Sequence, residues 1–582
     1  MHRCQLPQGR YNMKQLPNII FIIADQMKSN ALKMYSDVGI DTPHLETLAD
    51  QGVMFENAVT PHPLCVPARV SMMTSRYPHS TGSRRNETLM PPNQLHSFRI
   101  WKELGYTTGL FGKNHCFIQN SDLNLIDVRC ELSHMGLPKN DYLGEDKDTK
   151  GMDWVVPEST INESHSTREI MRKTTGAGES VISDHPINGY SSRAIPLQVE
   201  SFLERTVQGD DFGLNSPRRS EPTPFSIVVS FPAPHQPNEC PKEFRDLVPP
   251  ESIKLPPTNP SEFQGEEVPE RNSILYEMLK LDGKSENEKR EIISTYLALT
   301  KFVDDGIGRI LKKLDDLSIR ENTIIVFTAD HGDFAGEHNM FGKGGVFYDS
   351  LIKVPLIVSW SGSSIPQGEI DYSPVNTIDI LPTLLQLTGA VDFIDKRPLR
   401  NEQEIPNPVP IVCSEFKSEW INPEMLRRFQ GNPLPTVTKS KPRIAAFSEY
   451  GAGGINYTKE LFNKLPEKTG SPAIFDSLWA RESEGRRKMV RTPKWKYVTD
   501  LNSNFSCKND YASTAKNGDE LYDLQKDPWE LTNVAFDAIN TPIISEMRRL
   551  LLEWMISTED YNPVPLPDII GRGPKPVIDT NS

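Results

Sequence analysis

The sequence lacks a cysteine framework. Its seven cysteines are scattered without a C-x-x-C pair, and they are Cys4, Cys65, Cys116, Cys130, Cys240, Cys413 and Cys507. An odd number of scattered cysteines argues against a disulfide-stapled secreted domain and indicates reduced thiols in a reducing compartment. The first residues, MHRCQLPQGRYNMKQLPN, contain no apolar stretch of signal-peptide length. We therefore expect a cytoplasmic protein, with Met13 as an alternative start.

Long hydrophobic runs and an excess of positive charge are also missing. The apolar run Ile19–Ile23 is far too short to span a bilayer, so no membrane association is expected. The net charge of -14 and the pI of about 5.5 argue against nucleic acid or an anionic membrane as the main partner. An anionic substrate would therefore need positive charge concentrated at one local site.

Short apolar runs are present, and they predict buried strands. The predicted strands are Asn18–Ala24, Thr107–Phe111, Phe225–Phe231, Thr323–Thr328 and Val354–Trp360. Between them, helical spacing of apolar residues predicts helices over Pro43–Gln51, Lys289–Leu317 and Asn376–Thr388, the last kinked at Pro382. This alternation predicts an α/β fold with a large, mostly parallel sheet covered by helices on both faces.

The pattern of apolar and polar residues changes near residue 400. We expect a catalytic α/β domain over 15–400, with a polar, loop-rich insertion at about 117–222. Shorter alternating runs follow, so we expect a smaller C-terminal subdomain over 401–582. It would contain a short antiparallel sheet and a closing helix near Ile543–Met555.

Polar residues follow four of the predicted strands at the point where each strand ends. They are Asp25 and Gln26, Lys113 to His115, His235, and Asp330 and His331. In open α/β sheets, ligands bind beyond the carboxyl ends of the strands. Four such endings together predict one functional site at this edge of the sheet.

Asp25, Asp330 and His331 form a candidate site for a divalent metal, to which Gln26 can add a carbonyl oxygen. Hard cations prefer oxygen ligands, and imidazole suits transition metals. A lone aspartate at a strand end is as often a simple cap. The second aspartate, in Asp-His-Gly after another strand, favours the metal site.

Cys65 is a candidate nucleophile because Pro67 is placed to open a helix just after it. A helix N-terminus lowers a thiol's pKa and attracts anions. Arg69 lies one helical turn later and can face the same side. Taken alone, Cys65 would more often be an inert buried cysteine, and Lys113 and Lys343 would more often be solvated surface lysines.

These motifs resemble those of the sulfatase family, within the alkaline-phosphatase-like superfamily. NIIFIIADQ is similar to the family's first metal strand, and CVPAR to its C-x-P-x-R signature. GYTTGLFGKNH, PHQP and TADHGDFAGEHNMFGKGG resemble its lysine–histidine motif, its histidine loop and its second metal strand with the active-site lysine. ELYDLQKDPWELTN resembles the family's C-terminal strand and turn.

The resemblance implies that Cys65 is converted to formylglycine by a formylglycine-generating enzyme. One hydroxyl of the hydrated aldehyde would attack sulfur and displace the alcohol, and loss of a proton from the second would then expel sulfate. Asp25, Gln26, Asp330 and His331 would bind one divalent metal together with Cys65. Arg69 and His115 would support the diol, and Lys113 and Lys343 would hold sulfate oxygens. His235 would be the acid for the leaving alcohol.

Three positions depart from the family's usual pattern. Gln26 replaces an aspartate and His331 an asparagine, so Ca²⁺ stays the expected metal while Mn²⁺ becomes a second candidate. Ala68 stands where serine is more common but leaves C-x-P-x-R intact.

The natural substrate is expected to be a small-molecule or saccharide sulfate ester, and the sequence does not indicate the oligomeric state. One alternative is a phosphonate monoester or phosphodiester hydrolase of the same superfamily, because the same groups could act on phosphorus. The other is a non-catalytic, metal-containing binding protein on this scaffold.

Overall fold

The computed structural model describes residues 16–134, 136–137, 149–174, 179–213, 223–265, 267–394, 409–500 and 518–559. Met13 lies outside the described residues. All five described cysteines are free thiols. Within the same ranges, no helix combines the length and apolar character that crossing a membrane requires.

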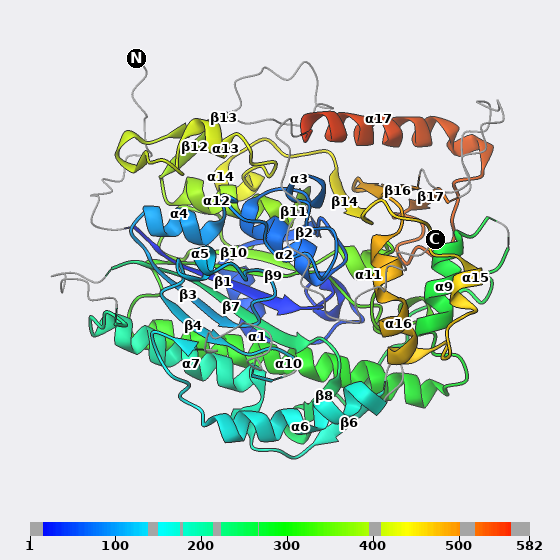
Figure 1. Ribbon diagram of the computed structural model, residues 1–582, viewed down its shortest axis with the longest axis horizontal. Helices are drawn as coiled ribbons and strands as arrows, with labels where there is room; N and C mark the ends of the chain where they lie inside the picture. The colour runs from blue at the N-terminus through cyan, green and yellow to red at the C-terminus, as the bar shows by residue number, and fades with distance from the viewer. Residues whose placement is uncertain are drawn as a thin grey trace, which may run out of the picture.

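A nine-stranded sheet forms the centre of the molecule, in the order β11-β2-β10-β9-β1-β7-β3-β4-β5 (Figure 1). Its strands are β1 (Asn18–Asp25), β2 (Gly52–Val59), β3 (Thr107–Gly112), β4 (Val128–Glu131), β5 (Thr149–Lys150), β7 (Phe225–Pro234), β9 (Thr323–Ala329), β10 (Leu356–Ser359) and β11 (Glu369–Asn376). The run from β9 to β4 is parallel, whereas β10 and β5 pair antiparallel with their neighbours. The predicted mostly parallel sheet is therefore confirmed.

The register of the three central strands brings their carboxyl ends level. Ile20 of β1 pairs with Ile227 of β7 on one side and with Ile325 of β9 on the other. All three strands are fully buried, which explains why they read as continuous apolar runs rather than as alternating ones. Residues that follow these strands therefore meet at one edge.

Helices cover both faces of the sheet (Figure 1). On one face lie α1 (Pro43–Asp50), α7 (Ser191–Val207) and the long α10 (Glu286–Asp316). On the other lie α2 (Cys65–Thr74), α4 (Ser97–Glu103) and α12 (Ile380–Leu387). Side chains of β1 and of these three helices line one small apolar cavity, among them Phe21, Met72, Trp101 and Leu384.

The helix predicted over Asn376–Thr388 begins later and is not kinked. Asn376 ends β11, a 3₁₀ turn follows over Thr377–Asp379, and α12 starts at Ile380. Pro382 therefore lies in the first turn of α12, where a missing backbone N–H breaks no intrahelical bond. The predicted kink is wrong for this reason.

The segment 117–222 has more regular structure than its sequence pattern indicates. It contains two 17-residue helices, α6 (Glu158–Thr174) and α7, and it supplies β4 and β5 to the main sheet. Helix α6 buries polar side chains, including Ser164, His165 and Arg168, so an apolar stripe does not mark its inner face. Helix α7 carries Pro196 in its interior, which argues against a helix in the sequence.

Beyond residue 409 the chain forms a four-stranded antiparallel sheet, in the order β14-β15-β16-β17. These strands are Ala446–Tyr450, Arg487–Arg491, Trp495–Asp500 and Glu520–Asp523. Helix α17 (Thr541–Ser557) closes the sheet, with Trp554 stacked on Phe447 at a ring distance of 4.9 Å. The predicted antiparallel sheet and closing helix are confirmed. The boundary at 400/401 stays a prediction because it lies outside the described residues.

Candidate active site

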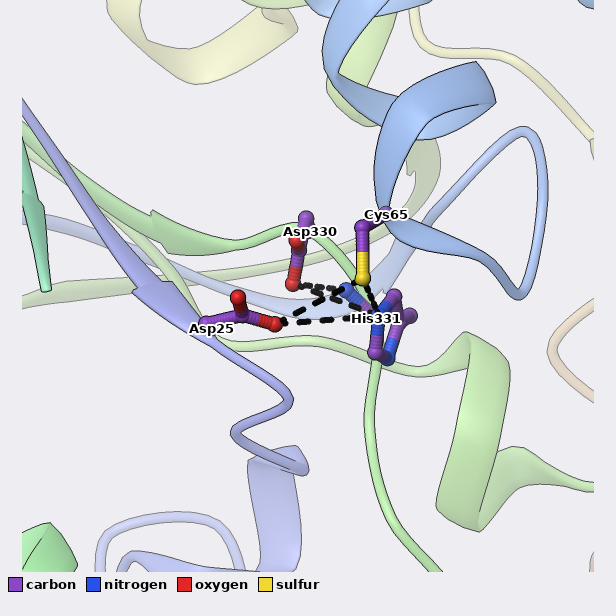
Figure 2. Close-up of side chains that lie close together, drawn as sticks. All are labelled: Asp25, Cys65, Asp330 and His331. Carbon is purple, nitrogen blue, oxygen red and sulfur yellow. Dashed lines mark hydrogen bonds and ion pairs between the residues drawn. The ribbon is translucent and has the colours of Figure 1, made fainter. Parts of the chain in front are cut away.

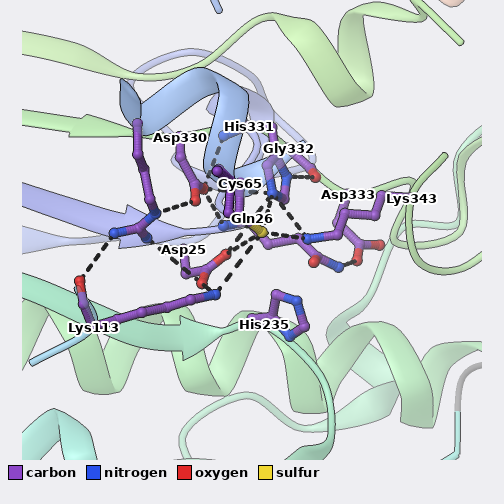
Figure 3. Close-up of polar contacts among 12 residues, drawn as sticks. Asp25, Gln26, Cys65, Lys113, His235, Asp330, His331, Gly332, Asp333 and Lys343 are labelled. Atoms are coloured by element: carbon purple, nitrogen blue, oxygen red, sulfur yellow. Dashed lines mark hydrogen bonds and ion pairs between the residues drawn. The ribbon is translucent and has the colours of Figure 1, made fainter. Parts of the chain in front are cut away.

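The site is built at the level edge of the central strands. Asp25 is the last residue of β1, and Lys113, His235 and Asp330 directly follow β3, β7 and β9. The four endings that the sequence placed at one edge therefore do lie together (Figure 3).

Asp25, Cys65, Asp330 and His331 form one fully buried cluster (Figure 2). One ligand atom from each lies within 4.8 Å of the others. Nε2 of His331 is 3.1 Å from Cys65 Sγ, 3.7 Å from Asp330 Oδ1 and 3.9 Å from Asp25 Oδ1. Atoms about 2.0–2.6 Å from a common cation lie roughly 3–4 Å apart, so these spacings suit a single ion.

Gln26 adds an unpaired oxygen beside this cluster. Its side chain is fully buried, and its Nε2 donates a hydrogen bond to Asp333 Oδ2. Its Oε1 has no hydrogen-bond partner among the described residues. A buried amide oxygen left without a donor is costly, and a metal ion would satisfy it. The residues present therefore fit a hard or borderline divalent cation.

The ring of His331 is oriented for ligation through Nε2. Its Nδ1 lies 3.0 Å from the carbonyl oxygen of Gly332, which can only accept. Nδ1 of the neutral ring therefore carries the hydrogen, and Nε2 presents its lone pair toward Cys65. Such a carbonyl partner is the usual means of fixing a metal-binding histidine.

Cys65 is the first residue of α2, with Leu64 as the N-cap, so the predicted position at a helix N-terminus is off by one residue. Burial and the Asp25 carboxylate act to raise the pKa of the thiol. The charges of Lys113 and Lys343 are the main groups that outweigh them, and they bring the pKa of Cys65 to about 7. Position 65 therefore favours a negative charge.

Two ammonium groups converge on Cys65 (Figure 3). Lys343 Nζ lies 2.9 Å from the sulfur and Lys113 Nζ lies 3.9 Å from it. Lys113 also donates to Asp25 Oδ2. Burial acts to raise the pKa of Asp25, but the charges of Lys113, Arg69 and Lys343 outweigh it and hold that pKa below its usual range. Two point charges beside one atom are suited to a tetrahedral anion.

Arg69 holds the carboxylates rather than Cys65 itself. Its Nε donates to Asp330 Oδ2 at 2.8 Å, and its guanidinium lies 3.6 Å from Asp25 Oδ2. It also donates to Ser230 Oγ at 2.8 Å. Arg69 thereby offsets charge and fixes the outer oxygens of two candidate ligands.

The two remaining candidate histidines, His115 and His235, differ in their surroundings. His115, with φ of 47°, is partly exposed and lies outside the four-residue cluster. His235 donates from Nδ1 to the carbonyl of Gln236 at 2.6 Å, so its neutral ring offers a lone pair at Nε2. Burial, with Lys343 and Lys113 nearby, holds the pKa of His235 well below its usual range.

The sequence reasoning missed three residues around this site. His134 stacks on His235 at a ring distance of 4.5 Å, and Arg168 donates to the carbonyl oxygens of His235 and Pro237. Both come from the segment 117–222, where no pattern marked them. Asp333 stands two residues after His331, and this carboxylate in Asp-His-Gly-Asp was a signal that could have been used.

Comparison with known proteins agrees with this geometry. The family model described as Sulfatase matches residues 17–390. The ulvan-active sulfatase of Formosa agariphila is 31% identical over 381 residues, which cover 64% of this chain and 62% of that protein. The match thus spans less than two thirds of that relative's length.

Solved structures show the same fold. The phosphonate monoester hydrolase of Agrobacterium radiobacter superposes with a TM-score of 0.64 at 19% identity, covering 93% of this chain and 96% of that one. A structure in complex with its substrate D-glucosamine-2-N,6-O-disulfate gives 0.58 at 18% identity, covering 94% and 99%. The family match over most of the α/β part, together with the cluster around Cys65, shows that this chain belongs to the sulfatase family.

Proposed function

We propose that this protein hydrolyses a sulfate monoester, with a nucleophile made from Cys65. The observation that carries the proposal is the convergence on Cys65 Sγ of two ammonium groups and a cation-suited cluster. A sulfate monoester is an anion, and it would find at this position the local positive charge that the net charge of -14 does not otherwise offer.

The proposed reaction needs two groups that the unmodified polypeptide does not contain, a formylglycine at position 65 and a divalent cation. Cys65, converted to formylglycine by a formylglycine-generating enzyme and hydrated, supplies the hydroxyl that attacks sulfur. A divalent cation held by Asp25, Gln26, Asp330 and His331 supplies Lewis acidity at that hydroxyl. Three oxygen donors and one imidazole nitrogen suit Ca²⁺ and Mn²⁺, and we propose both for testing.

The lysines and Arg69 act on charge. Lys113 and Lys343 are placed to hold sulfate oxygens and to stabilise the charge that grows on them in the transition state. Arg69, bound to Asp330 and Ser230, keeps the ligand carboxylates in place while residue 65 reacts. We propose that His115 does not contact the sulfur atom of the substrate. It would act as a supporting hydrogen-bond donor to residue 65.

His235 is proposed to protonate the leaving alcohol, but only with substrate bound. In the free protein its ring is neutral because burial and two lysines disfavour the cation. A bound sulfate ester adds negative charge beside the same lysines and thereby favours protonation of Nε2. The proton would then pass to the alcohol oxygen as the S–O bond breaks.

A saccharide sulfate is the natural substrate class that we propose. The ulvan-active relative and the structure with a glucosamine disulfate support this class. The fold shared with a phosphonate monoester hydrolase makes phosphorus esters the necessary comparison.

The test is a comparison of initial rates for an aryl sulfate, a phosphonate monoester and a phosphodiester with the same leaving group. The protein is co-produced with a formylglycine-generating enzyme and assayed with Mn²⁺ or Ca²⁺, next to Cys65→Ala. Fastest hydrolysis of the sulfate, lost in the variant, supports the proposal. Faster hydrolysis of a phosphorus ester, or no hydrolysis by fully converted protein, contradicts it.

A further inference from the structure

We infer that Asp333 sets the orientation of the Gln26 amide and so decides whether residue 26 offers oxygen or nitrogen to the metal site. Asp333 is thus a positioning residue, which acts on the ion through Gln26. The inference rests on the metal binding contained in the proposed function.

Asp333 is held rigidly by backbone donors. Its side chain is buried, with the residue 1% exposed, and Oδ1 accepts from the N–H of Ala335 at 2.6 Å and from that of Gly342 at 3.0 Å. This leaves Oδ2 to face Gln26 (Figure 3). The Asp333 carboxyl group thus accepts from two backbone N–H groups and from the NH₂ end of the Gln26 amide, an arrangement of acceptors that fixes which end of the amide faces it.

Gln26 cannot avoid this contact by moving its backbone. Its N–H donates to Asp330 Oδ1 at 3.0 Å, and its carbonyl accepts from the Tyr296 hydroxyl at 2.8 Å. Its φ of 65° puts the backbone in the left-handed region that few non-glycine residues adopt. With both backbone groups and Nε2 engaged, Oε1 is the one polar atom of Gln26 left over, and it is buried beside the cluster.

The same carboxylate also holds the chain that carries Lys343. Gly342, which donates to Asp333, directly precedes Lys343, whose ammonium group contacts Cys65. Asp333 therefore connects a candidate metal ligand with a candidate sulfate-binding lysine. An amide at position 26, in place of a second ligand carboxylate, is compatible with Asp333 because two facing carboxylates would repel each other.

Asp333→Asn is the most direct test. The new side chain keeps an acceptor for Ala335 and Gly342 but turns an NH₂ toward Gln26. The Gln26 amide must then rotate to offer its oxygen to that NH₂, which leaves its own NH₂ facing the metal site. We expect about 10- to 100-fold weaker binding of Mn²⁺ or Ca²⁺, the range typical of lost partners behind metal ligands.

Adding Gln26→Glu to this variant should restore binding. One oxygen of the new carboxylate would accept from the NH₂ introduced at position 333, and the other would face the ion. In the wild-type background, Gln26→Glu alone sets a carboxylate against Asp333 and should bind the ion more weakly than the double variant. Simple addition of a negative charge would predict the opposite order.

The experiment is isothermal titration calorimetry of the four full-length proteins with Mn²⁺ and with Ca²⁺, with thermal unfolding as the check on folding. Weak binding by D333N that Q26E restores supports the inference. Equal affinities of wild type and D333N, no restoration, or no binding by folded wild type would overturn it. If D333N does not fold, Q26E alone decides, because binding as tight as the wild type contradicts the inference.

Hydrolysis of an aryl sulfate is measured separately on the wild type. If the wild type binds the ion but cleaves no sulfate ester, the proposed function fails while the role of Asp333 stands. If it cleaves the ester while D333N keeps full affinity, only the role of Asp333 fails.

Discussion

At the scale of single residues, the charges around Cys65 predict the pH at which its thiol ionises in protein that has not been converted to formylglycine. The lowered pKa of about 7 means that the thiolate forms as pH rises through neutrality. A free thiol ionises only near about 8.5. The ultraviolet absorbance of the thiolate, taken as the difference between wild type and Cys65→Ala, should therefore rise with a midpoint near pH 7.

Lys343→Met should move that midpoint upward, because it removes the ammonium group 2.9 Å from the sulfur. Lys254→Met is the matched control, since Lys254 is a surface residue whose ion pair among the described residues is with exposed Asp37. A midpoint that ignores Lys343 would contradict the charge arrangement described for the site.

The protonation state of His235 can also be tested. Its pKa lies well below its usual range, so the ring stays neutral as pH falls and takes up a proton only well below pH 6.5. Histidine-selective NMR, with His235→Ala for assignment, should show no titration of this ring between pH 8 and pH 6. Inorganic sulfate bound in the site should raise its pKa, and an unchanged value would contradict its proposed role as an acid.

At the scale of elements, the turn after β9 depends on a glycine. A Cβ at Gly332 would lie 1.9 Å from the carbonyl oxygen of Ser350, so Gly332→Ala must displace the chain that carries Asp330 and His331. We expect a loss of about 1–3 kcal/mol in stability and weaker metal binding. Thermal unfolding with and without Mn²⁺ measures both.

Gly209→Ala provides the comparison for this turn. Apart from its chain neighbours, no atom of the described residues lies within 4 Å of a Cβ at Gly209, so the expected cost is that of its positive φ of 80°. Metal binding should be unchanged there. Weakened binding in both variants, or in neither, would argue against a specific role of the Gly332 turn.

The contact of helix α6 with the His235 loop, made by Arg168, can also be tested. Arg168→Met removes the donor to the carbonyls of His235 and Pro237 and leaves two acceptors without it. Because His235 is the proposed acid for the leaving group, kcat should fall more for a poor leaving group, such as a saccharide sulfate, than for an aryl sulfate. Arg205→Met, at a partly exposed position on α7, is the control. An equal loss on both substrates would indicate a structural role only.

Elements with one clear burial pattern could be predicted from the sequence. The strand β1 and its neighbours were found because both of their faces are buried, and their endings located Asp25, Lys113, His235 and Asp330. Helices α6 and α7 were missed because buried polar residues and Pro196 hide their inner faces. His134, Arg168 and the pairing of Asp333 with Gln26 depend on tertiary contacts, which no local spacing records.

At the scale of the whole molecule, buried polar contacts join the C-terminal sheet to the α/β part. Arg491 of β15 donates to Asp349 at 2.8 Å and to Asn57 of β2 at 2.9 Å. Burial opposes ionisation of Asp349, but Arg491 and Lys496 hold its pKa below the usual range. Removing one partner of a buried pair costs about 3–5 kcal/mol. Arg491→Met should therefore destabilise the whole chain in thermal or urea unfolding.

The pH dependence of stability follows from the sign of this shift. A carboxyl group whose pKa is lowered by folding stabilises the protein above its unfolded pKa, about 3.9, and this contribution is lost as pH falls below that value. The difference in stability between wild type and Arg491→Met should therefore shrink in acid. Arg549→Met, which removes a partly exposed surface pair, should change stability little. Equal effects of the two variants would contradict the proposed role of Arg491 in holding the C-terminal sheet to the α/β part.

Whether residue 65 becomes the nucleophile can be decided by one paired measurement. The protein is produced with and without a formylglycine-generating enzyme. The converted fraction of Cys65 is read by mass spectrometry of its peptide, and aryl sulfate turnover is measured on the same samples. Turnover should be proportional to the converted fraction and absent in Cys65→Ala. Equal turnover by unconverted protein would contradict it.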